Sequence, residues 1–229
     1  MANFLLIHGA YQGGWIWTRV AAKLRAAGHV VFAPSMDGCA ERRGGLRKDI
    51  TLESCATELA QLMMYEDLKD VVLAGTSNGG MVMAKTAELA RERVGRLVFV
   101  DALALLDGEK VSDIVVRGIQ RETTELATGP TKDDIETRLF KDLDPATRAW
   151  AVARYTLQPI ATLEAPVKLP TFWSQDWKAT VIYCKRSTNP PEAHQRRCAE
   201  RLKATWHELD TGHYPMLSTP AELAKLLMA

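Results

Sequence analysis

The sequence lacks both a long apolar run and a strong excess of charge of one sign. No stretch approaches the roughly 20 apolar residues that a membrane-spanning helix needs, and the 229 residues carry a net charge of +1. Such a balance offers no electrostatic basis for binding nucleic acid or an anionic membrane. No basic segment followed by an apolar stretch precedes the first predicted strand, so a secretory signal is not expected. We therefore expect a cytoplasmic protein that has neither nucleic acid nor a membrane as a partner.

Cysteine is scarce, and the chain has no internal repeat or low-complexity segment. The four cysteines, Cys39, Cys55, Cys184 and Cys198, are scattered and lack the spacing of metal ligands. We interpret them as buried thiols and predict no metal site. With 47% hydrophobic and 25% charged residues, the chain can bury the core of one globular domain. The sequence leaves open whether that domain is a monomer or a homodimer.

Predicted strands alternate with predicted helices except in one long segment. Apolar runs predict buried strands, and amphipathic patterns predict helices, at 3–7, 15–27, 30–33, 52–65, 71–74, 97–100, 180–184, 191–204, 206–209 and 220–228. This alternation predicts a doubly wound, mainly parallel sheet of the α/β class. From 103 to 177 it stops, with helical patches at 131–141 and 145–154 and no clear strand. We predict a core of 1–102 and 178–229 with a helical cap of 103–177 over the site.

The strongest motif is a serine between a predicted strand and a predicted helix. Residues 75–79 read Gly-Thr-Ser-Asn-Gly, with an apolar run before them and a helical pattern after them. In a nucleophile elbow, this arrangement turns the chain so sharply that the serine is strained and its hydroxyl is exposed. A Gly-x-Ser-x-Gly pattern also occurs in ordinary tight turns, but the flanking elements here favour Ser77 as a nucleophile.

A serine hydroxyl is a weak nucleophile until a neighbouring base takes its proton. Of the five histidines, His213 alone falls on a loop between the last strand and the last helix, after a glycine and close before a proline. We predict that His213 is the base. The oxyanion formed by the attack needs two preorganised N–H donors. We expect the backbone amides of Asn78, at the start of the elbow helix, and Ala10, after the first strand, to supply them.

The acid that would orient the imidazole is missing from its usual place. The predicted strand that ends at residue 184 is followed by Lys-Arg-Ser-Thr-Asn-Pro, with no carboxylate. Asp101 ends the strand that follows the elbow helix, so it could reach the same imidazole from a neighbouring strand. Glu192 is a second candidate, although it is expected to start a helix. A third arrangement has no acid and uses a neutral hydrogen bond from Ser187 or Asn189.

Aromatic side chains are frequent in the segment expected to form the cap. Trp150 and Trp173 lie in it, and Tyr11 lies in the loop after the first strand. Aromatic residues of a small helical layer also serve as its own core. We take Tyr11, Trp150 and Trp173 as candidates for the lining of an apolar acyl or alcohol pocket.

Four motifs are spread along nearly the whole chain: Phe-Leu-Leu-Ile-His-Gly-Ala at 4–10, Gly-Gly-Trp-Ile-Trp at 13–17, the elbow at 75–79, and Asp-Thr-Gly-His-Tyr-Pro-Met-Leu at 210–217. With these motifs the chain resembles the α/β-hydrolase fold, and more narrowly the branch of plant methyl-ester esterases and hydroxynitrile lyases with their bacterial esterase relatives. The resemblance implies a Ser-His-Asp triad, no cofactor and a cap-covered pocket for small or aromatic esters.

Two departures from that branch bear on function. The lyases carry a threonine in the first-strand loop and a lysine directly after the catalytic histidine, where this chain has Ala10 and Tyr214. These residues favour hydrolysis over cyanohydrin cleavage. The family also usually places its acid at the position that aligns with Ser187, so the departure there is what brings Asp101 into consideration.

Together these features predict a serine hydrolase that cleaves a small, apolar or aromatic carboxylic ester through an acyl-enzyme. Ser77 attacks, His213 acts first as base and then as acid, and Asp101 orients His213. An amide, carbamate or lactone could be cleaved by the same site. Two further candidate functions are a hydroxynitrile lyase and a ligand-binding protein that has lost efficient catalysis, and the missing acid after residue 184 would favour the latter.

Overall fold

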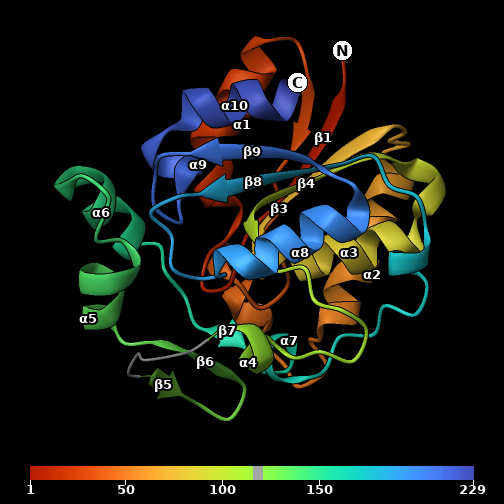
Figure 1. Ribbon diagram of the computed structural model, residues 1–229. Coiled ribbons are helices and arrows are strands. Elements are labelled where there is room, and N and C mark those ends of the chain that lie inside the picture. The colour runs from red at the N-terminus through yellow and green to blue at the C-terminus, as the bar shows by residue number, and fades with distance from the viewer. Residues whose placement is uncertain (116–120) are drawn as a thin grey trace.

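The computed structural model describes residues 1–115 and 121–229, and a six-stranded sheet forms its centre (Figure 1). The strand order is β2-β1-β3-β4-β8-β9, and every neighbouring pair is parallel. The chain runs outward from β1 to β2 and then crosses back to β3. The strand order therefore reverses between β1 and β3, which is where open α/β sheets place their ligand sites. The strands are β1 (Asn3–Ile7), β2 (Val30–Phe32), β3 (Val71–Ser77), β4 (Val94–Ala102), β8 (Ala179–Cys184) and β9 (Thr205–Leu209).

Helices cover both faces of this sheet, so the predicted doubly wound α/β architecture is confirmed. In β1, Leu5 and Ile7 point into one hydrophobic cluster, while Phe4 and Leu6 point into the other. Burial on both faces explains why the strands read as continuous apolar runs. One face carries α2 (Leu52–Tyr65), α3 (Gly79–Leu89) and α8 (Glu192–Leu202), and the other carries α1 (Thr18–Ala26), α9 (Pro215–Ser218) and α10 (Pro220–Met228). Short 3-10 turns η1 (Gly14–Trp17), η2 (Ala40–Gly45) and η3 (Arg91–Arg93) complete the core.

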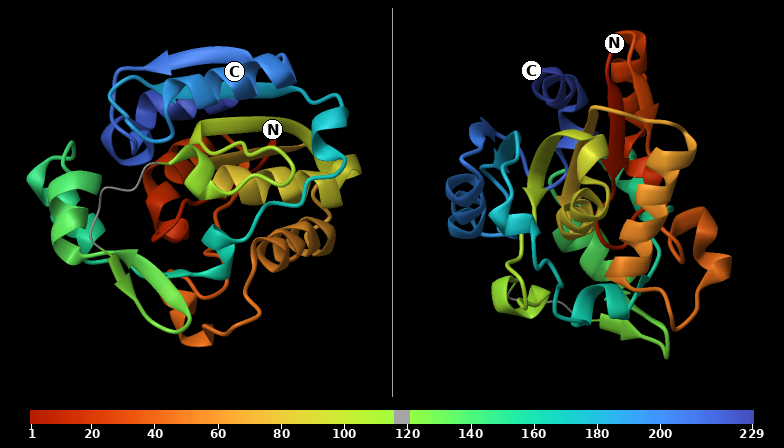
Figure 2. Two further views of the ribbon diagram at one scale, coloured as in Figure 1. Left: turned by 60° about the horizontal axis from the view of Figure 1, so that its bottom comes forward. Right: turned by 90° about the vertical axis from the view of Figure 1, so that its right-hand side faces the viewer.

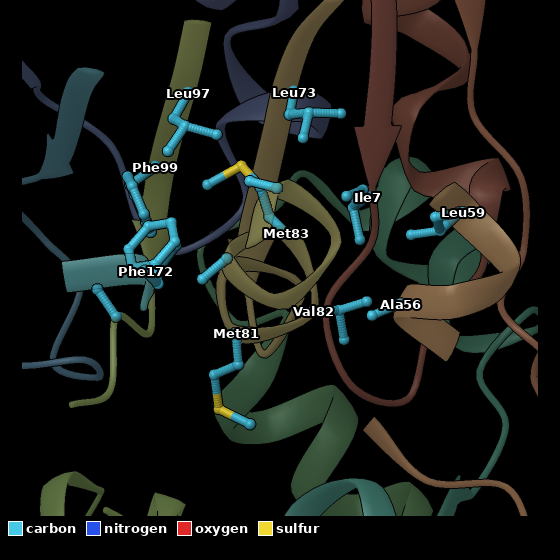
Figure 3. Close-up of a cluster of buried hydrophobic side chains, with 14 of the residues drawn as sticks. Ile7, Ala56, Leu59, Leu73, Met81, Val82, Met83, Leu97, Phe99 and Phe172 are labelled. Atoms are coloured by element: carbon cyan, nitrogen blue, oxygen red, sulfur yellow. The ribbon is translucent and has the colours of Figure 1, made fainter. Parts of the chain in front are cut away.

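The helix that follows the predicted elbow is enclosed by the core. All residues of α3 from Gly79 to Ala87 are buried. Figure 3 shows Met81, Val82 and Met83 of this helix among side chains of β1, β3, β4 and α2. A helix packed on so many sides cannot shift without disturbing the sheet, so it holds the turn before it in a fixed place.

Residues 103–177 leave the sheet after β4 and return before β8. Their helical elements are α4 (Val111–Ile114), α5 (Lys132–Asp134), the π-helical turn η4 (Ile135–Leu139), α6 (Pro145–Val152), α7 (Ala161–Glu164) and the 3-10 turn η5 (Phe172–Ser174). Figures 1 and 2 show most of these elements together on the side of the core that lies away from both chain termini. We refer to this segment as the cap. Residues 116–120 of the predicted cap lie outside the described residues.

The cap also contains strands, which corrects the expectation that it has none. A small antiparallel sheet has the order β5-β6-β7, formed by β5 (Arg121–Thr123), β6 (Ala127–Pro130) and β7 (Gln158–Pro159). Strands of two to four residues are too short to show an alternating pattern, and β6 contains a glycine and a proline, which are typical of turns.

Within the described residues, none of the helices is long and apolar enough to cross a membrane.

Candidate active site

Ser77 lies at the sharp turn between β3 and α3. Its φ is 50°, in the left-handed region that residues other than glycine seldom adopt. Gly9, in the loop after β1, passes close beside it, and a Cβ added to Gly9 would lie only 2.8 Å from the Ser77 Cβ. The strain and the close approach of this loop are the features expected of a nucleophile elbow. Ser77 forms part of the wall of a cavity.

Asp101 is placed by a bulge near the end of β4. Ser77 pairs with Ala102, while the residue before Ser77 pairs with Val100, so Asp101 is an extra residue on its strand. Its φ of 45° is left-handed as well. A bulge of this kind breaks the regular alternation of side chains and redirects one of them. Here the bulge brings the Asp101 carboxylate to His213.

The Asp101 side chain is fully buried and accepts three hydrogen bonds. Oδ2 accepts from His213 Nδ1 at 2.5 Å. Oδ1 accepts from Gln195 Nε2 at 2.7 Å and from the Cys184 backbone amide at 3.3 Å. The imidazole itself keeps 19% of its surface exposed. The buried carboxylate thus has three hydrogen-bond donors, one of which is Nδ1 of a partly exposed imidazole.

The remaining candidates for orienting His213 have weaker geometry. Ser187 Oγ lies 3.5 Å from His213 Nδ1, and the same hydroxyl donates to the Asn189 carbonyl at 3.2 Å. Glu192 starts α8, as expected from the sequence, and its Oε1 accepts from Arg196 Nε at 2.9 Å on the exposed face of that helix. The contact of Asp101 with the imidazole is therefore a full 1 Å shorter than that of Ser187.

The loop after β1 is held in place by buried polar contacts. His8 Nδ1 donates to the Gly9 carbonyl at 2.7 Å, and Nε2 accepts from the Met36 amide at 2.9 Å. Burial lowers the pKa of His8 to about 4, so the ring stays neutral and can serve as donor and acceptor at once. Tyr11 has a left-handed φ of 70°, and its amide donates to Gln158 Oε1 at 3.1 Å. The cap residue Gln158 thereby fixes the loop that carries Ala10.

Ala10 and Asn78 both form part of the same cavity wall as Ser77. Asn78 directly precedes α3, where backbone N–H groups lack helical partners. Among residues 1–115 and 121–229, neither the Ala10 nor the Asn78 amide donates to a protein acceptor. Both amides therefore remain the candidates for the two oxyanion donors that the sequence predicts.

The cavity beside Ser77 has a volume of about 410 Å³, within the range of small-molecule sites. Tyr11, His213 and Tyr214 contribute to its wall together with residues 186–190, which follow β8. The charged side chains around it are Arg138, Lys141, Asp142 and Arg186, and its apolar lining is formed by Leu103, Val111, Val115, Leu139 and Leu163.

Two aromatic residues predicted to line the pocket, Trp150 and Trp173, are not among the described residues of the cavity wall. Trp150 packs edge-on against Trp15, with ring centroids 5.2 Å apart. Trp173 donates from Nε1 to the Leu105 carbonyl at 3.0 Å and packs on the ring of Phe172. Both rings are partly buried and pack against the two clusters of the core. Aromatic character indicates burial but does not specify which surface a ring covers.

Some residues at the site escaped the sequence interpretation. Gln195 contacts Asp101, and the only available signal is that it falls on the buried face of α8 with Cys198 and Leu202, where a polar side chain is unusual. Leu163 lies in a helix of four residues, too short for a periodic pattern.

No group of three or more His, Cys, Asp or Glu side chains is placed to hold a metal ion within the described ranges.

Comparison with known proteins gives matches that span the core and the cap. A sequence profile of the alpha/beta hydrolase family matches residues 4–226. The chain is 29% identical to a carbendazim hydrolyzing esterase from Nocardioides sp., over 100% of this chain and 99% of that protein. It is 25% identical to methylesterase 7 of Arabidopsis thaliana, over 99% and 95%. An extracellular alpha/beta-hydrolase from a Paenibacillus species has a similar structure, with a TM-score of 0.80, 23% identity and coverage of 100% and 98%.

Proposed function

Because this chain belongs to the alpha/beta hydrolase family and is an enzyme of the carboxylesterase type, we propose that it cleaves a carboxylic ester through an acyl-enzyme on Ser77. One observation carries the proposal: His213 Nδ1 lies 2.5 Å from the buried Asp101 carboxylate, and His213 lines the same cavity as the strained Ser77. That contact keeps the proton on Nδ1 and leaves Nε2 free to accept one from a serine hydroxyl.

The reaction runs in two halves. Ser77 Oγ attacks the ester carbonyl carbon as His213 Nε2 takes its proton, and the amides of Ala10 and Asn78 bind the oxyanion. The tetrahedral intermediate collapses when His213 gives this proton to the leaving alcohol. A water molecule, deprotonated by the same imidazole, then attacks the acyl-enzyme, which releases the carboxylic acid and restores Ser77.

Asp101 is the acid in this proposal, in place of Glu192 or a neutral partner. When His213 takes up the serine proton it becomes an imidazolium, and a buried carboxylate stabilises that charge more than the hydroxyl of Ser187 can. The 2.5 Å contact to Asp101, against 3.5 Å to Ser187, supports this assignment. It also counts against a ligand-binding protein with lost catalysis, since that reading depended on a missing acid.

Hydrolysis is proposed over the lyase reaction because of the residue after His213. Tyr214 is buried against Phe140, with ring centroids 4.7 Å apart. Burial raises the pKa of its phenol, so Tyr214 stays uncharged. It supplies no ammonium group of the kind that the resembled lyases carry at this position.

We further propose a small substrate with an apolar group on one side of the ester. A cavity of about 410 Å³, whose described wall includes Leu103, Leu139 and Leu163, supports this size and polarity. Relatives named as a carbendazim hydrolyzing esterase and a methylesterase support an ester of modest size. An amide, carbamate or lactone uses the same acyl-transfer steps and remains the alternative.

The four free, buried cysteines support a reducing, cytoplasmic location.

The first test measures hydrolysis of a panel of p-nitrophenyl and methyl esters and labelling by a serine-directed fluorophosphonate. We expect Ser77→Ala to lose the label and to lower kcat by roughly 10⁶-fold. Asp101→Asn should keep the fold and lower kcat by roughly 10⁴-fold, because the proton would then sit on His213 Nε2, which must be free to accept the serine proton.

Glu192→Gln is the matched control, and we expect it to retain wild-type turnover. Wild-type rates in Asp101→Asn would contradict the assignment of the acid. A wild-type protein that hydrolyses no ester in the panel and takes up no label would instead support a ligand-binding protein.

A further inference from the structure

We propose that Gln195 is a positioning residue for the triad, because its side-chain amide holds the Asp101 carboxylate in the orientation that pairs with His213. The inference rests on the proposed function. Gln195 lies near the start of α8, a helix that contributes no group to the reaction as proposed above, and it is 1% exposed. Its side chain reaches the triad through Asp101, and it also contacts the Pro190 carbonyl at the cavity wall.

The orientation of the Gln195 amide is fixed by two acceptors. Its Nε2 donates to Asp101 Oδ1 at 2.7 Å and to the Pro190 carbonyl at 3.2 Å, so both amide hydrogens are used. The reversed orientation would place Oε1 against a carboxylate and a carbonyl oxygen, which repel it. Gln195 can only be a donor to Asp101.

The other end of the same amide has no partner. Within the described residues, the Oε1 atom of Gln195 is buried and accepts no hydrogen bond. A buried, unsatisfied acceptor is unfavourable, and an apolar side chain of the same length would avoid it. The fold keeps an amide here in spite of this penalty, which points to a role for its donor end.

That role follows from the unusual place of the acid. Asp101 lies on a bulge with a left-handed backbone, so the strand ladder does not by itself set the direction of its side chain. Gln195 and the Cys184 amide both bond to Oδ1, which leaves Oδ2 to face His213. The two donors on one oxygen prevent the carboxylate from rotating.

The chemical type of the donor also suits the reaction. A lysine or arginine in place of Gln195 would neutralise the carboxylate and weaken its attraction for the imidazolium that forms when Ser77 is deprotonated. A neutral amide stabilises the buried charge while leaving it available to His213. Gln195 thus orients the Asp101 carboxylate toward His213 without bringing a positive charge next to it.

The test compares Gln195→Met with Arg196→Met, the same replacement at the next position of α8, where the side chain is exposed. We expect Gln195→Met to lower kcat by about ten- to a hundredfold, as loss of a supporting hydrogen bond commonly does, with KM unchanged. Arg196→Met should match the wild type. The far-downfield NMR resonance of the proton between His213 and Asp101 should shift in Gln195→Met and stay in Arg196→Met.

A double variant separates positioning from other effects. If Gln195 acts through Asp101, then Asp101→Asn/Gln195→Met is no slower than Asp101→Asn alone. Losses that multiply, or a Gln195→Met variant with wild-type kcat and an unshifted resonance, would overturn the inference. If Gln195→Met does not fold, Gln195→Leu, which also lacks a donor, takes its place in the same assays, and wild-type turnover in that variant overturns the inference equally.

Failure of this inference is distinct from failure of the proposed function. A wild type without ester turnover or phosphonate labelling would disprove the function. A wild type with both, whose Gln195 variants are unaltered, would disprove only the role of Gln195.

Discussion

The sheet core and the cap hold their backbones in place by different means. In the core, Gly75 pairs with Ile7 on one side and Phe99 on the other, so residues far apart in sequence form one ladder between two apolar clusters. In the cap, the side chain of Arg148 donates to three backbone carbonyls between residues 140 and 143. Gln158 donates to Thr162 Oγ1 in the same local manner. The core backbone is thus held mainly by long-range strand pairing, whereas the cap adds local polar contacts to the apolar side chains that it buries.

This division matches the division of labour in the proposed reaction. The nucleophile, base and acid are all in the core, at or beyond the carboxyl ends of β3, β9 and β4. The cap contributes side chains to the cavity wall, including Leu139 and Leu163. It also reaches the β1 loop through the contact of Gln158 with the Tyr11 amide. We expect changes in the core to alter the chemistry and changes in the cap to alter which substrate enters.

A pair of glycine substitutions tests how rigid each region is, and it has the largest expected effect. A Cβ on Gly79 in α3 would lie 2.5 Å from the His8 carbonyl oxygen and 2.6 Å from that of Ile7, which are backbone atoms at the end of β1. A Cβ on Gly129 in β6 would lie 2.1 Å from the Tyr155 hydroxyl, so that side chain would have to move and give up its hydrogen bond to the Pro130 carbonyl. The core site meets backbone atoms that cannot move separately, whereas the cap site meets the end of a side chain.

We therefore expect Gly79→Ala to lower the free energy of unfolding by about 3 kcal/mol and to abolish ester turnover, because the elbow must move. Gly129→Ala should cost less, about 1 kcal/mol for the lost Tyr155 hydrogen bond, and leave kcat intact. Urea unfolding and a p-nitrophenyl ester assay give both quantities. Equal losses in the two variants would mean that the cap is packed as rigidly as the core.

The same contrast decides how much of the fold the sequence could predict. The predicted strand 3–7 and helices 52–65 and 220–228 agree residue for residue with β1, α2 and α10. Burial on one or both faces leaves a clear apolar pattern in such elements. The predicted cap helix 131–141 is instead divided into α5 and the π-helical turn η4, and the cap strands were missed. Local polar contacts leave no comparable periodicity.

At the site, motifs predicted positions better than they predicted contacts. The Gly-x-Ser-x-Gly pattern and the loop before the last helix place Ser77 and His213 in one cavity wall. The approach of Asp101 depends on one extra residue in β4, and a bulge of this kind leaves no mark in the apolar run. The support of Asp101 by Gln195 depends on how α8 packs, which only the folded chain determines.

Acid should weaken both regions through two buried histidines. His8 bonds within the core, and His194 Nε2 accepts from the amide of Ala104 at the start of the cap. Burial lowers the pKa of each to about 4, and for His194 the nearby Arg197 guanidinium adds to the effect. Unfolded histidine titrates near 6.5. The native state therefore binds fewer protons than the unfolded state between about pH 6.5 and 4.

The sign follows from that difference in proton binding. The contribution of each histidine to stability is complete above pH 6.5 and is lost as the pH falls toward 4, by up to about 1.4 kcal/mol per pH unit. We expect the free energy of unfolding of His194→Gln, measured in urea at pH 5, 6 and 7, to depend less steeply on pH than that of the wild type. The difference in slope should correspond to up to one proton, and the remaining slope should include the titration of His8. A slope equal to that of the wild type would show that His194 does not stay neutral on folding.

The smallest expected effects concern which cap side chains contact the substrate. Leu163 is buried in the cavity wall, so Leu163→Val removes one methylene there and should raise KM for an apolar ester by up to about tenfold. Trp173 is not among the described residues of the cavity wall, and its indole donates to the Leu105 carbonyl. Trp173→Phe loses that bond, so it should cost about 1 kcal/mol of stability and leave KM unchanged. A rise in KM in Trp173→Phe without one in Leu163→Val would show that the substrate binds beside Trp173 and not beside Leu163.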